Sequence, residues 1–264
     1  MVKFGFCVNL TQEADNMAGI TYAPVLAEAG YDYIELPADR ISRLSETEYK
    51  HVLAVLQDCV LPCMACNNFL PSSLCLTGEE VTPIAEVKSY LEFAFERIAS
   101  LGAKVVVFGS PWSRNCPPGF DFARAEEQVA DFLITASEMA SGITIAIENN
   151  NKSETNMMNL VADVGRMVSI VGRENVKMHC DYYHLRFAGE APEVLYDFPG
   201  QLAHIHIARL KNRSYFTSLD GEVPEIYRFA DVLRKLDYSG GLSIEALGKA
   251  EAAQNLKIMK QVFS

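Results

Sequence analysis

Four segments in the second half of the chain share one pattern, in which a short apolar run gives way to an ionisable residue. The clearest run begins at Ile143, is rich in isoleucine, and turns polar at Glu148. A buried parallel strand that leads into a functional loop has this pattern. Similar runs reach Asp181, His206 and Glu245. We therefore predict strands that carry ionisable side chains at their ends.

Strand-like runs alternate with stretches of helical spacing along the whole chain. Apolar residues recur every three or four positions between Ile84 and Leu101, which predicts a helix with one buried face. Ser45 and Glu48 form a capping box, and Thr82 followed by Pro83 marks another helix start. We expect strands at 3–8, 31–36, 60–65, 104–108, 143–148, 175–181, 202–207 and 241–245. Helices are expected at 21–29, 45–56, 82–101, 121–141, 160–171, 192–197, 224–236 and from about 250.

Eight strand-helix units without a linker predict an α/β fold, a closed (β/α)₈ TIM barrel in which residues 1–264 form a single domain. An open doubly wound sheet is the alternative. It is weakened because the chain has no Gly-x-Gly-x-x-Gly motif and no Walker loop. Barrel enzymes carry their active sites in the loops at the carboxyl ends of the strands.

Composition narrows the possible partners and compartment. The chain has 264 residues, of which 49% are hydrophobic, and no apolar run reaches the roughly 18 residues that a membrane span needs. It enters a strand directly at its start, and seven cysteines argue against a disulfide framework, so we expect a cytoplasmic protein. The net charge of -11 disfavours nucleic acid as a partner.

The four ionisable strand ends suggest a metal site, because adjacent strands of a barrel bring them to one region of its mouth. Glu148, Asp181, His206 and Glu245 would supply three carboxylates and one imidazole. This set suits a divalent cation that prefers oxygen ligands. We expect one such ion, with Mn²⁺ as the first choice and Mg²⁺, Co²⁺ or Zn²⁺ as alternatives.

A metal that holds a carbonyl and a neighbouring hydroxyl acidifies the C–H bond between them and stabilises the enediolate. Two glutamates on opposite sides of that carbon could remove and return the proton. The predicted reaction is therefore the epimerisation of a sugar or an aldose–ketose isomerisation.

Several motifs resemble those of the xylose-isomerase-like TIM barrels, and most closely the D-tagatose/D-psicose 3-epimerases. The resemblance rests on Glu148 with Glu154, Asp181-Tyr-Tyr-His184, His204-Ile-His206 and Ser-Ile-Glu245. It implies that the four residues above ligate a metal and that Glu148 and Glu245 are the acid/base pair. It also implies a homo-oligomer, either a dimer or a tetramer, acting on a small-molecule sugar. The residues that it implies in substrate binding are Glu154, His184, Arg213, Cys66 and Trp112.

Other activities remain open on the same scaffold. Arg209 and Lys211 put positive charges near the mouth, which would suit an acidic or phosphorylated substrate. The resemblance also implies two close alternatives, hydroxypyruvate isomerase and inosose dehydratase, because these enzymes share the same metal scaffold. A metallonuclease of the endonuclease IV type needs more histidines than the five present, and a non-catalytic sugar-binding protein would not need both glutamates.

Five residues have a structural interpretation beside a functional one. His204 is expected to be either a hydrogen-bonded interior residue or a partner of a metal ligand, and His179 to be a satisfied core histidine. Glu35 is either a pocket residue or an interior ion-pair partner. Cys63 and Cys66 have the spacing of half a zinc site, but without a second pair we expect buried thiols.

Overall fold

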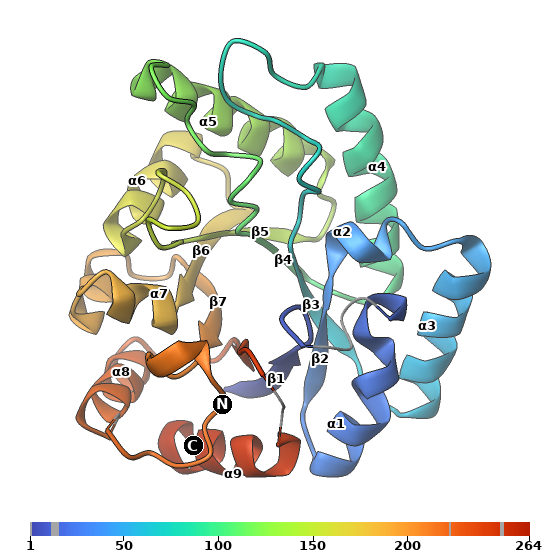
Figure 1. Cartoon of the computed structure of the whole chain (residues 1–264), viewed down its shortest axis with the longest axis vertical. Coiled ribbons are helices and arrows are strands. Elements are labelled where there is room, and N and C mark those ends of the chain that lie inside the picture. Colours follow the sequence, from blue (N-terminus) through green and yellow to red (C-terminus); the bar gives the residue numbers. More distant parts are fainter. Residues whose placement is uncertain (1, 12–15, 222, 249–250) are drawn as a thin grey trace.

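The computed structural model describes residues 2–11, 16–221, 223–248 and 251–264, and it confirms the barrel (Figure 1). Eight parallel strands pair in sequence order, and β1 pairs with β8 to close the sheet. The strands are β1 (Lys3–Cys7), β2 (Tyr33–Pro37), β3 (Cys63–Asn67), β4 (Val105–Phe108), β5 (Thr144–Glu148), β6 (Val176–Asp181), β7 (Leu202–Ile207) and β8 (Gly241–Ile244).

Helices surround the strands on the outside of the barrel (Figure 1), and α9 packs against α1 and α8 to complete the ring. The α-helices are α1 (Ala23–Ala29), α2 (Ala38–Ile41), α3 (Glu46–Asp58), α4 (Ile84–Ser100), α5 (Phe122–Met139), α6 (Val161–Val171), α7 (Tyr182–Phe187), α8 (Val223–Lys235) and α9 (Ala252–Phe263). The 3₁₀ helices are η1 (Met17–Tyr22), η2 (Pro192–Asp197) and η3 (Lys211–Arg213).

The capping box of α3 and the apolar spacing of α4 act as expected from the sequence. The Ser45 hydroxyl accepts from the backbone N–H of Glu48, and the Glu48 carboxylate accepts from the N–H of Ser45, so the capping box is complete. Helix α4 buries the apolar face that its spacing predicts, including Val87, Leu91 and Ile98. This packing fixes the helices against the sheet and leaves the strand ends free to carry polar groups.

The third strand lies later in the chain than the sequence predicted. Val60 is 87% exposed and has a left-handed backbone with φ of 52°, so it belongs to the turn after α3. Pairing with β2 begins at Cys63 and runs to Asn67. Because side chains alternate between the two faces of a strand, this shift changes which residues reach the barrel mouth.

Two helix assignments also need correction. Thr82 is not the N-cap of α4, because Pro83 takes that position and the Thr82 hydroxyl instead accepts from the N–H of Cys75 at 2.8 Å. The expected helix at 192–197 is the 3₁₀ helix η2, while the α-helix that follows β6 is α7. The short α2 after β2 was not expected either, and the expected start of the last helix at residue 250 lies outside the described residues.

Within the part of the chain that the structure describes, no helix combines the length and apolar character needed to cross a bilayer.

Candidate metal centre and substrate pocket

The structure brings the four expected ligands together at the carboxyl ends of β5 to β8. Glu148, Asp181 and His206 lie in the last two positions of their strands, and Glu245 follows β8 directly. Each offers a ligand atom, and these atoms all lie within 4.8 Å of one another. All four side chains are buried. At this spacing, the four residues could hold a single metal ion.

His206 is held so that one ring nitrogen faces this cluster. Its Nε2 lies 2.8 Å from Oε1 of Glu35, on β2 across the barrel interior. Its Nδ1 has no hydrogen-bond partner among the described residues, and lies 3.4 Å from Glu245 Oε2 and 3.9 Å from Glu148 Oε1. A histidine that ligates a metal usually has a carboxylate on its other nitrogen, so Glu35 orients His206 with Nδ1 as the candidate ligand.

Glu35 is therefore an interior ion-pair partner and not a pocket residue. Its second oxygen lies 2.8 Å from Nε2 of His204, and the Ser243 hydroxyl donates to the same oxygen at 2.6 Å. Burial opposes ionisation of this carboxyl, but the two imidazoles outweigh it and hold the pKa of Glu35 well below its usual value. His204 has the interior partner role that the sequence predicts.

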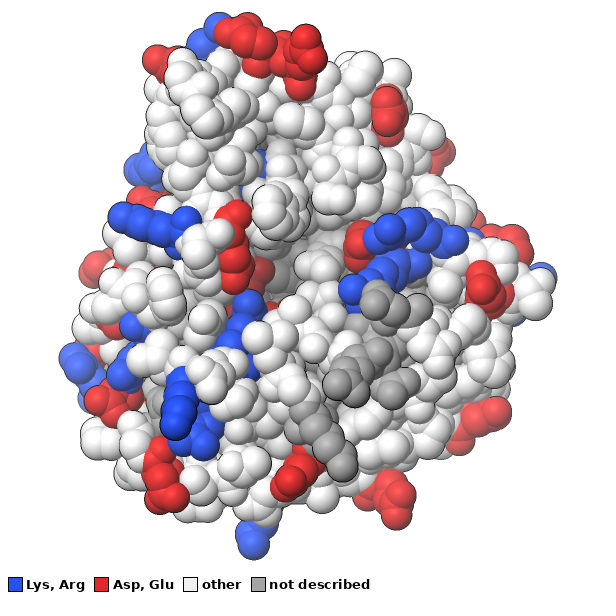
Figure 2. All heavy atoms as spheres, in the orientation of Figure 1, with Lys and Arg blue, Asp and Glu red and all other residues white. Residues whose placement is uncertain are grey.

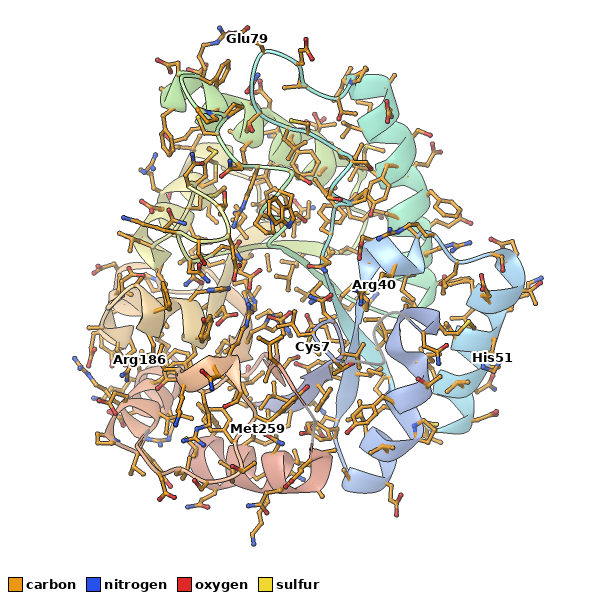
Figure 3. All side chains as sticks on the ribbon, in the orientation of Figure 1. Cys7, Arg40, His51, Glu79, Arg186 and Met259 are labelled. Carbon is orange, nitrogen blue, oxygen red and sulfur yellow. The ribbon has the colours of Figure 1, made fainter. Side chains whose placement is uncertain are left out.

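Side chains from β1 and β3 contact one carboxylate oxygen of Glu245. Asn67 Nδ2 donates to Glu245 Oε1 at 2.9 Å, and the Cys7 thiol lies 3.5 Å from the same oxygen. Cys7, which is labelled in Figure 3, is buried inside the ring of strands. The other oxygen, Oε2, is left to face His206 and Arg213.

The electrostatics of the cluster favour a bound cation. Burial, together with the charges of Glu245 and Asp181, raises the pKa of Glu148 well above its usual value. Glu245 has the opposite shift: burial opposes ionisation, but Arg213 and His206 lower its pKa overall. Three carboxylates at such close range repel one another unless positive charge is supplied nearby.

Arg213 supplies part of that charge. Its Nη2 lies 2.9 Å from Asp181 Oδ2 and also contacts Glu245 Oε2, while Nη1 lies 3.5 Å from Glu154 Oε1. The side chain extends from η3 and its guanidinium lies over the ring of Tyr183. The unpartnered Nδ1 of His206, the carboxylate set and this stand-in cation together fit a divalent metal ion.

Asp181 divides its two oxygens between two roles. Oδ1 accepts from the backbone N–H of His184 at 3.2 Å and caps α7, while Oδ2 faces Arg213 and the cluster. His184 is buried, with Nδ1 at 3.2 Å from Asn151 Nδ2 and Nε2 at 3.6 Å from both Asp181 and Glu154. The cap and the candidate ligand are therefore the same side chain.

Three consecutive asparagines after β5 organise the loop that carries Glu154. The Asn149 side chain accepts from the N–H of Asp181 at 3.0 Å and so joins the ends of β5 and β6. Asn150 and Asn151 donate to the two oxygens of Glu154 at 3.1 and 2.8 Å. Their positions beside Glu148 were visible in the sequence, but two of their partners, Asp181 and His184, come from the end of β6 and from α7.

Arg114 is a functional-site neighbour that the sequence analysis did not single out. It is fully buried, donates to the backbone oxygen of Glu148 at 2.7 Å, and contacts Asn150 Oδ1. Burial lowers its pKa to about 10. Nothing in the sequence distinguishes it from a surface arginine, because its partners lie 34 and 36 positions later in the chain.

A pocket of about 390 Å³ opens above the cluster and reaches Glu148, Glu154, Arg213 and Glu245 (Figure 2 shows the hollow). Trp112, in the loop after β4, lines its rim and is 75% exposed. The pocket also contacts Asn9, Leu10, Asp39, Asn68, Leu70, Ser72, Ser110, Pro111, Ser113 and Asn150.

Cys66 does not lie where the sequence predicted. It is buried within β3, beside Cys63, and does not line this pocket. The shift of β3 explains the error, since Asn67 is the neighbour whose side chain points to the cluster. Arg209 and Lys211 do not line the pocket either, and Arg209 instead donates to the backbone oxygen of Asp220.

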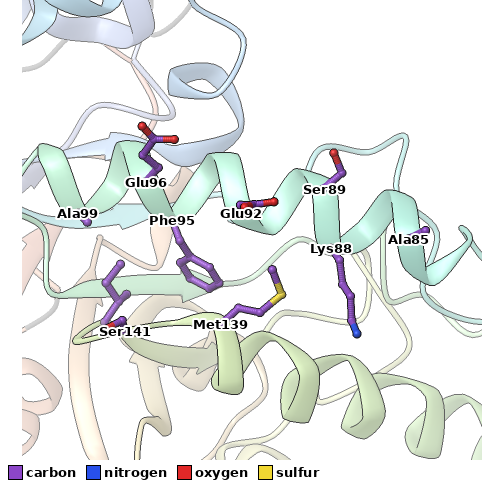
Figure 4. Close-up of a pocket in the computed structure, with 10 residues that line it drawn as sticks. Ala85, Lys88, Ser89, Glu92, Phe95, Glu96, Ala99, Met139 and Ser141 are labelled. Atoms are coloured by element: carbon purple, nitrogen blue, oxygen red, sulfur yellow. The ribbon is translucent and has the colours of Figure 1, made fainter.

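A second and larger groove, of about 710 Å³, lies on the outside of the barrel between α4 and the end of α5 (Figure 4). It is lined by Lys88, Glu92, Phe95 and Met139 among others, and none of the strand-end residues reaches it. The strand-end residues Glu148 and Glu245 therefore line the smaller pocket and not this groove.

The fold and this strand-end cluster define a class of TIM barrels, and a comparison with known families identifies it. The profile of the family described as "Xylose isomerase-like TIM barrel" matches residues 24–262. The chain belongs to this family, which confirms the resemblance seen in its motifs.

Individual relatives within the family are sugar epimerases. D-psicose 3-epimerase of Agrobacterium fabrum is 24% identical over 86% of this chain and 79% of its own length. L-ribulose 3-epimerase of a Methylomonas species is 27% identical over 83% of this chain and 75% of its own. The solved structure of a Methylomonas D-allulose 3-epimerase with D-allulose superposes with a TM-score of 0.85 at 20% identity, covering 99% of this chain and 97% of that one.

Proposed function

We propose that this protein is a metal-dependent epimerase of a ketose, in which Glu148 and Glu245 exchange a proton with the substrate. The observation that carries the proposal is the approach of both glutamates to the unpartnered Nδ1 of His206, with Glu148 Oε1 at 3.9 Å and Glu245 Oε2 at 3.4 Å. Both also line the pocket, so a substrate carbon can approach them. The expected enzyme class, isomerase, is the class to which the epimerase relatives belong.

The protein's own residues would divide the work as follows. Glu148, Asp181, His206 and Glu245 would hold one divalent cation, which, when bound, polarises the substrate carbonyl and stabilises the charge left by the departing proton. One glutamate takes the proton from the carbon, and the other returns a proton to the opposite face. The raised pKa of Glu148 and the lowered pKa of Glu245 give the pair different proton affinities.

The remaining predicted contacts would bind the substrate hydroxyls. Glu154, His184 and Arg213 surround the cluster on the side of the β5–α6 loop, and Trp112 offers an aromatic face at the rim. Cys66 is not part of this proposal, since it does not line the pocket.

The pocket supports a neutral substrate over a phosphorylated one. Its described lining holds four acidic residues against one arginine, Arg213, which already contacts three carboxylates. A phosphate would meet repulsion there. The same surface opposes the phosphate backbone of nucleic acid, which disfavours the nuclease alternative.

Solvent deuterium exchange tests the proposal directly. The Mn²⁺-loaded protein would be incubated in D₂O with D-psicose, with D-fructose, which is its C3 epimer, and with L-ribulose. We expect deuterium at C3 together with the C3 epimer, and loss of both after thorough chelation. Glu245→Gln should abolish exchange at C3 while the ketose still binds.

The position of the label separates the remaining alternatives. Deuterium at C1 with formation of an aldose would identify an aldose–ketose isomerase, and hydroxypyruvate would be tested in the same way. Loss of water from inosose would identify a dehydratase. Undiminished exchange in the double variant Glu148→Gln/Glu245→Gln would rule out the two-base mechanism.

A further inference from the structure

His179 is a buried histidine that the proposed chemistry does not use. Its side chain is fully buried on β6, and its ring lies edge-on to His206 with centroids 4.2 Å apart and stacks on His204 at 5.5 Å. Neither ring nitrogen has a hydrogen-bond partner among the described residues, against the expectation of a satisfied core histidine. A buried imidazole must carry at least one N–H, and leaving that donor unpaired is costly.

The nearest acceptor for His179 is Glu148, its neighbour in the register of β5 and β6. Nε2 of His179 lies 3.8 Å from Glu148 Oε1, a little beyond hydrogen-bond distance. The other oxygen of Glu148, Oε2, lies over Gly109, where an added Cβ would stand only 2.1 Å away. The two oxygens therefore have different surroundings: Oε1 faces the histidines, and Oε2 faces the loop after β4.

A comparison with His206 indicates which role His179 is built for. His206 has the Glu35 carboxylate on one nitrogen, the arrangement that prepares an imidazole as a metal ligand. His179 has no such partner on Nδ1. A neutral imidazole has one N–H to donate, and the Nε2 of His179 is the nitrogen that faces Glu148.

We propose that His179 is a positioning residue for Glu148, with Nε2–H donating to Oε1 so that the carboxylate keeps one orientation in the cluster. Only a small approach, from 3.8 Å to about 3.0 Å, is needed to form this hydrogen bond. With Oε1 held among the histidines, Oε2 is left free to exchange the proton. That last consequence rests on the proposed function, whereas the hydrogen bond and its effect on metal binding do not.

The matched variants are His179→Gln, whose amide N–H reaches about as far as Nε2, and His179→Leu, which fills the space without a donor. We expect His179→Leu to bind Mn²⁺ roughly tenfold or more weakly than the wild type, and His179→Gln to stay within about threefold. In steady-state kinetics, His179→Leu should have a lower kcat than the wild type with little change in KM. His179→Gln should have a kcat close to that of the wild type. Equal Mn²⁺ affinities in wild type and His179→Leu, or equal losses in both variants, would overturn the proposal.

Two further measurements cover the other outcomes. If His179→Leu does not fold, His179→Asn replaces it, because its amide reaches only the position of Nδ1 and should behave as the donor-free variant. The visible spectrum of the Co²⁺-loaded His179→Gln protein should match the wild type, since a change of ligand field would mean that His179 itself ligates the metal.

The tautomer can be read without metal or substrate. In the metal-free wild-type protein, ¹⁵N NMR of the His179 ring should show the proton on Nε2. A proton on Nδ1 would contradict the proposal whatever the protein binds or converts. This result also separates failure of the positioning role from failure of the proposed epimerase activity, which is judged by deuterium exchange alone.

Discussion

Glu148 is the residue whose surroundings are most tightly specified. An ideal Cβ on Gly109 would lie 2.1 Å from Glu148 Oε2, so the absence of a side chain at Gly109 makes room for the carboxylate. We predict that Gly109→Ala displaces Glu148 and lowers kcat/KM by about 100-fold, the scale expected for a misplacement of about 1 Å. Steady-state kinetics of the metal-saturated enzyme checks this.

Gly165→Ala is the matched control for that change. Its Cβ would meet the Phe198 ring at the same 2.1 Å, but on α6 and away from the cluster. We expect it to lower the free energy of unfolding while Mn²⁺ affinity stays near that of the wild type. If both variants lose activity in proportion to their stability, the contact between Gly109 and Glu148 has no special role.

Metal affinity should depend on pH through Glu148. Its pKa is raised by burial and by Glu245 and Asp181, so the carboxyl keeps its proton at pH values where a free glutamate has lost it. A cation must displace that proton, so affinity for Mn²⁺ should rise with pH, and Glu148 should contribute about tenfold per unit below its raised pKa. His206 adds to the slope, because Glu35 and Glu245 outweigh burial and raise its pKa as well. Calorimetric titrations across pH measure this slope. A slope of zero, or the same slope in Glu148→Gln, would assign the proton to another group.

The residues of the site could be predicted from the sequence wherever an apolar run shows the end of a strand. Glu148, Asp181, His206 and Glu245 follow apolar runs, and a barrel collects such positions in one place. No such pattern marks Asn67, Gly109 or Arg114. Asn67 and Arg114 matter through contacts with residues 34 or more positions away in the sequence. Gly109 matters because it leaves space for the carboxylate of Glu148. Cys66 was misplaced because β3 continues to Asn67, so that Cys66 lies within the strand and its neighbour Asn67 reaches the cluster.

At the scale of elements, the side chain of Asn149 joins the ends of β5 and β6, in addition to the backbone hydrogen bonds between the two strands. Asn149 accepts from the N–H of Asp181 and donates to its backbone oxygen at 3.4 Å. Asn149→Ala would leave this buried N–H unpaired, and we predict a loss of about 1–3 kcal/mol in the free energy of unfolding. Urea denaturation measures it, with the exposed Gln57→Ala expected to stay within about 0.5 kcal/mol.

A loss for Asn149→Ala as small as that for Gln57→Ala would show that water replaces the amide without cost. In that case the loop after β5 would not be held by this contact. The measured difference therefore decides whether the asparagine fixes the distance between Glu148 and Asp181.

Elements with a long, regular pattern were predicted best. Helix α4 and strands β4 to β8 lie within a few residues of their expected bounds, because each shows repeated apolar spacing. Helices α2 and α7 span four and six residues, too few for a helical period to be recognised. Strand β3 was displaced because Val60 and Leu61 look like strand residues, although Val60 lies in a left-handed turn.

At the scale of the whole molecule, the fold follows from alternation and number. Eight strand-helix units predicted closure, and the observed order, with β1 beside β8, confirms it. Closure places Glu35 of β2 across the interior from His204 and His206 of β7, which no local pattern could reveal. The expected dimer or tetramer stays a prediction, which sedimentation velocity would check.

The central claim is that four residues from successive strands form one metal site at the barrel mouth. Diffraction data collected at the manganese edge from crystals soaked in Mn²⁺ test it most directly. We predict a single anomalous peak within about 2.3 Å of oxygens from Glu148, Asp181 and Glu245 and of Nδ1 of His206. A peak that lies elsewhere, or one that two or more of these side chains do not reach, would contradict the account.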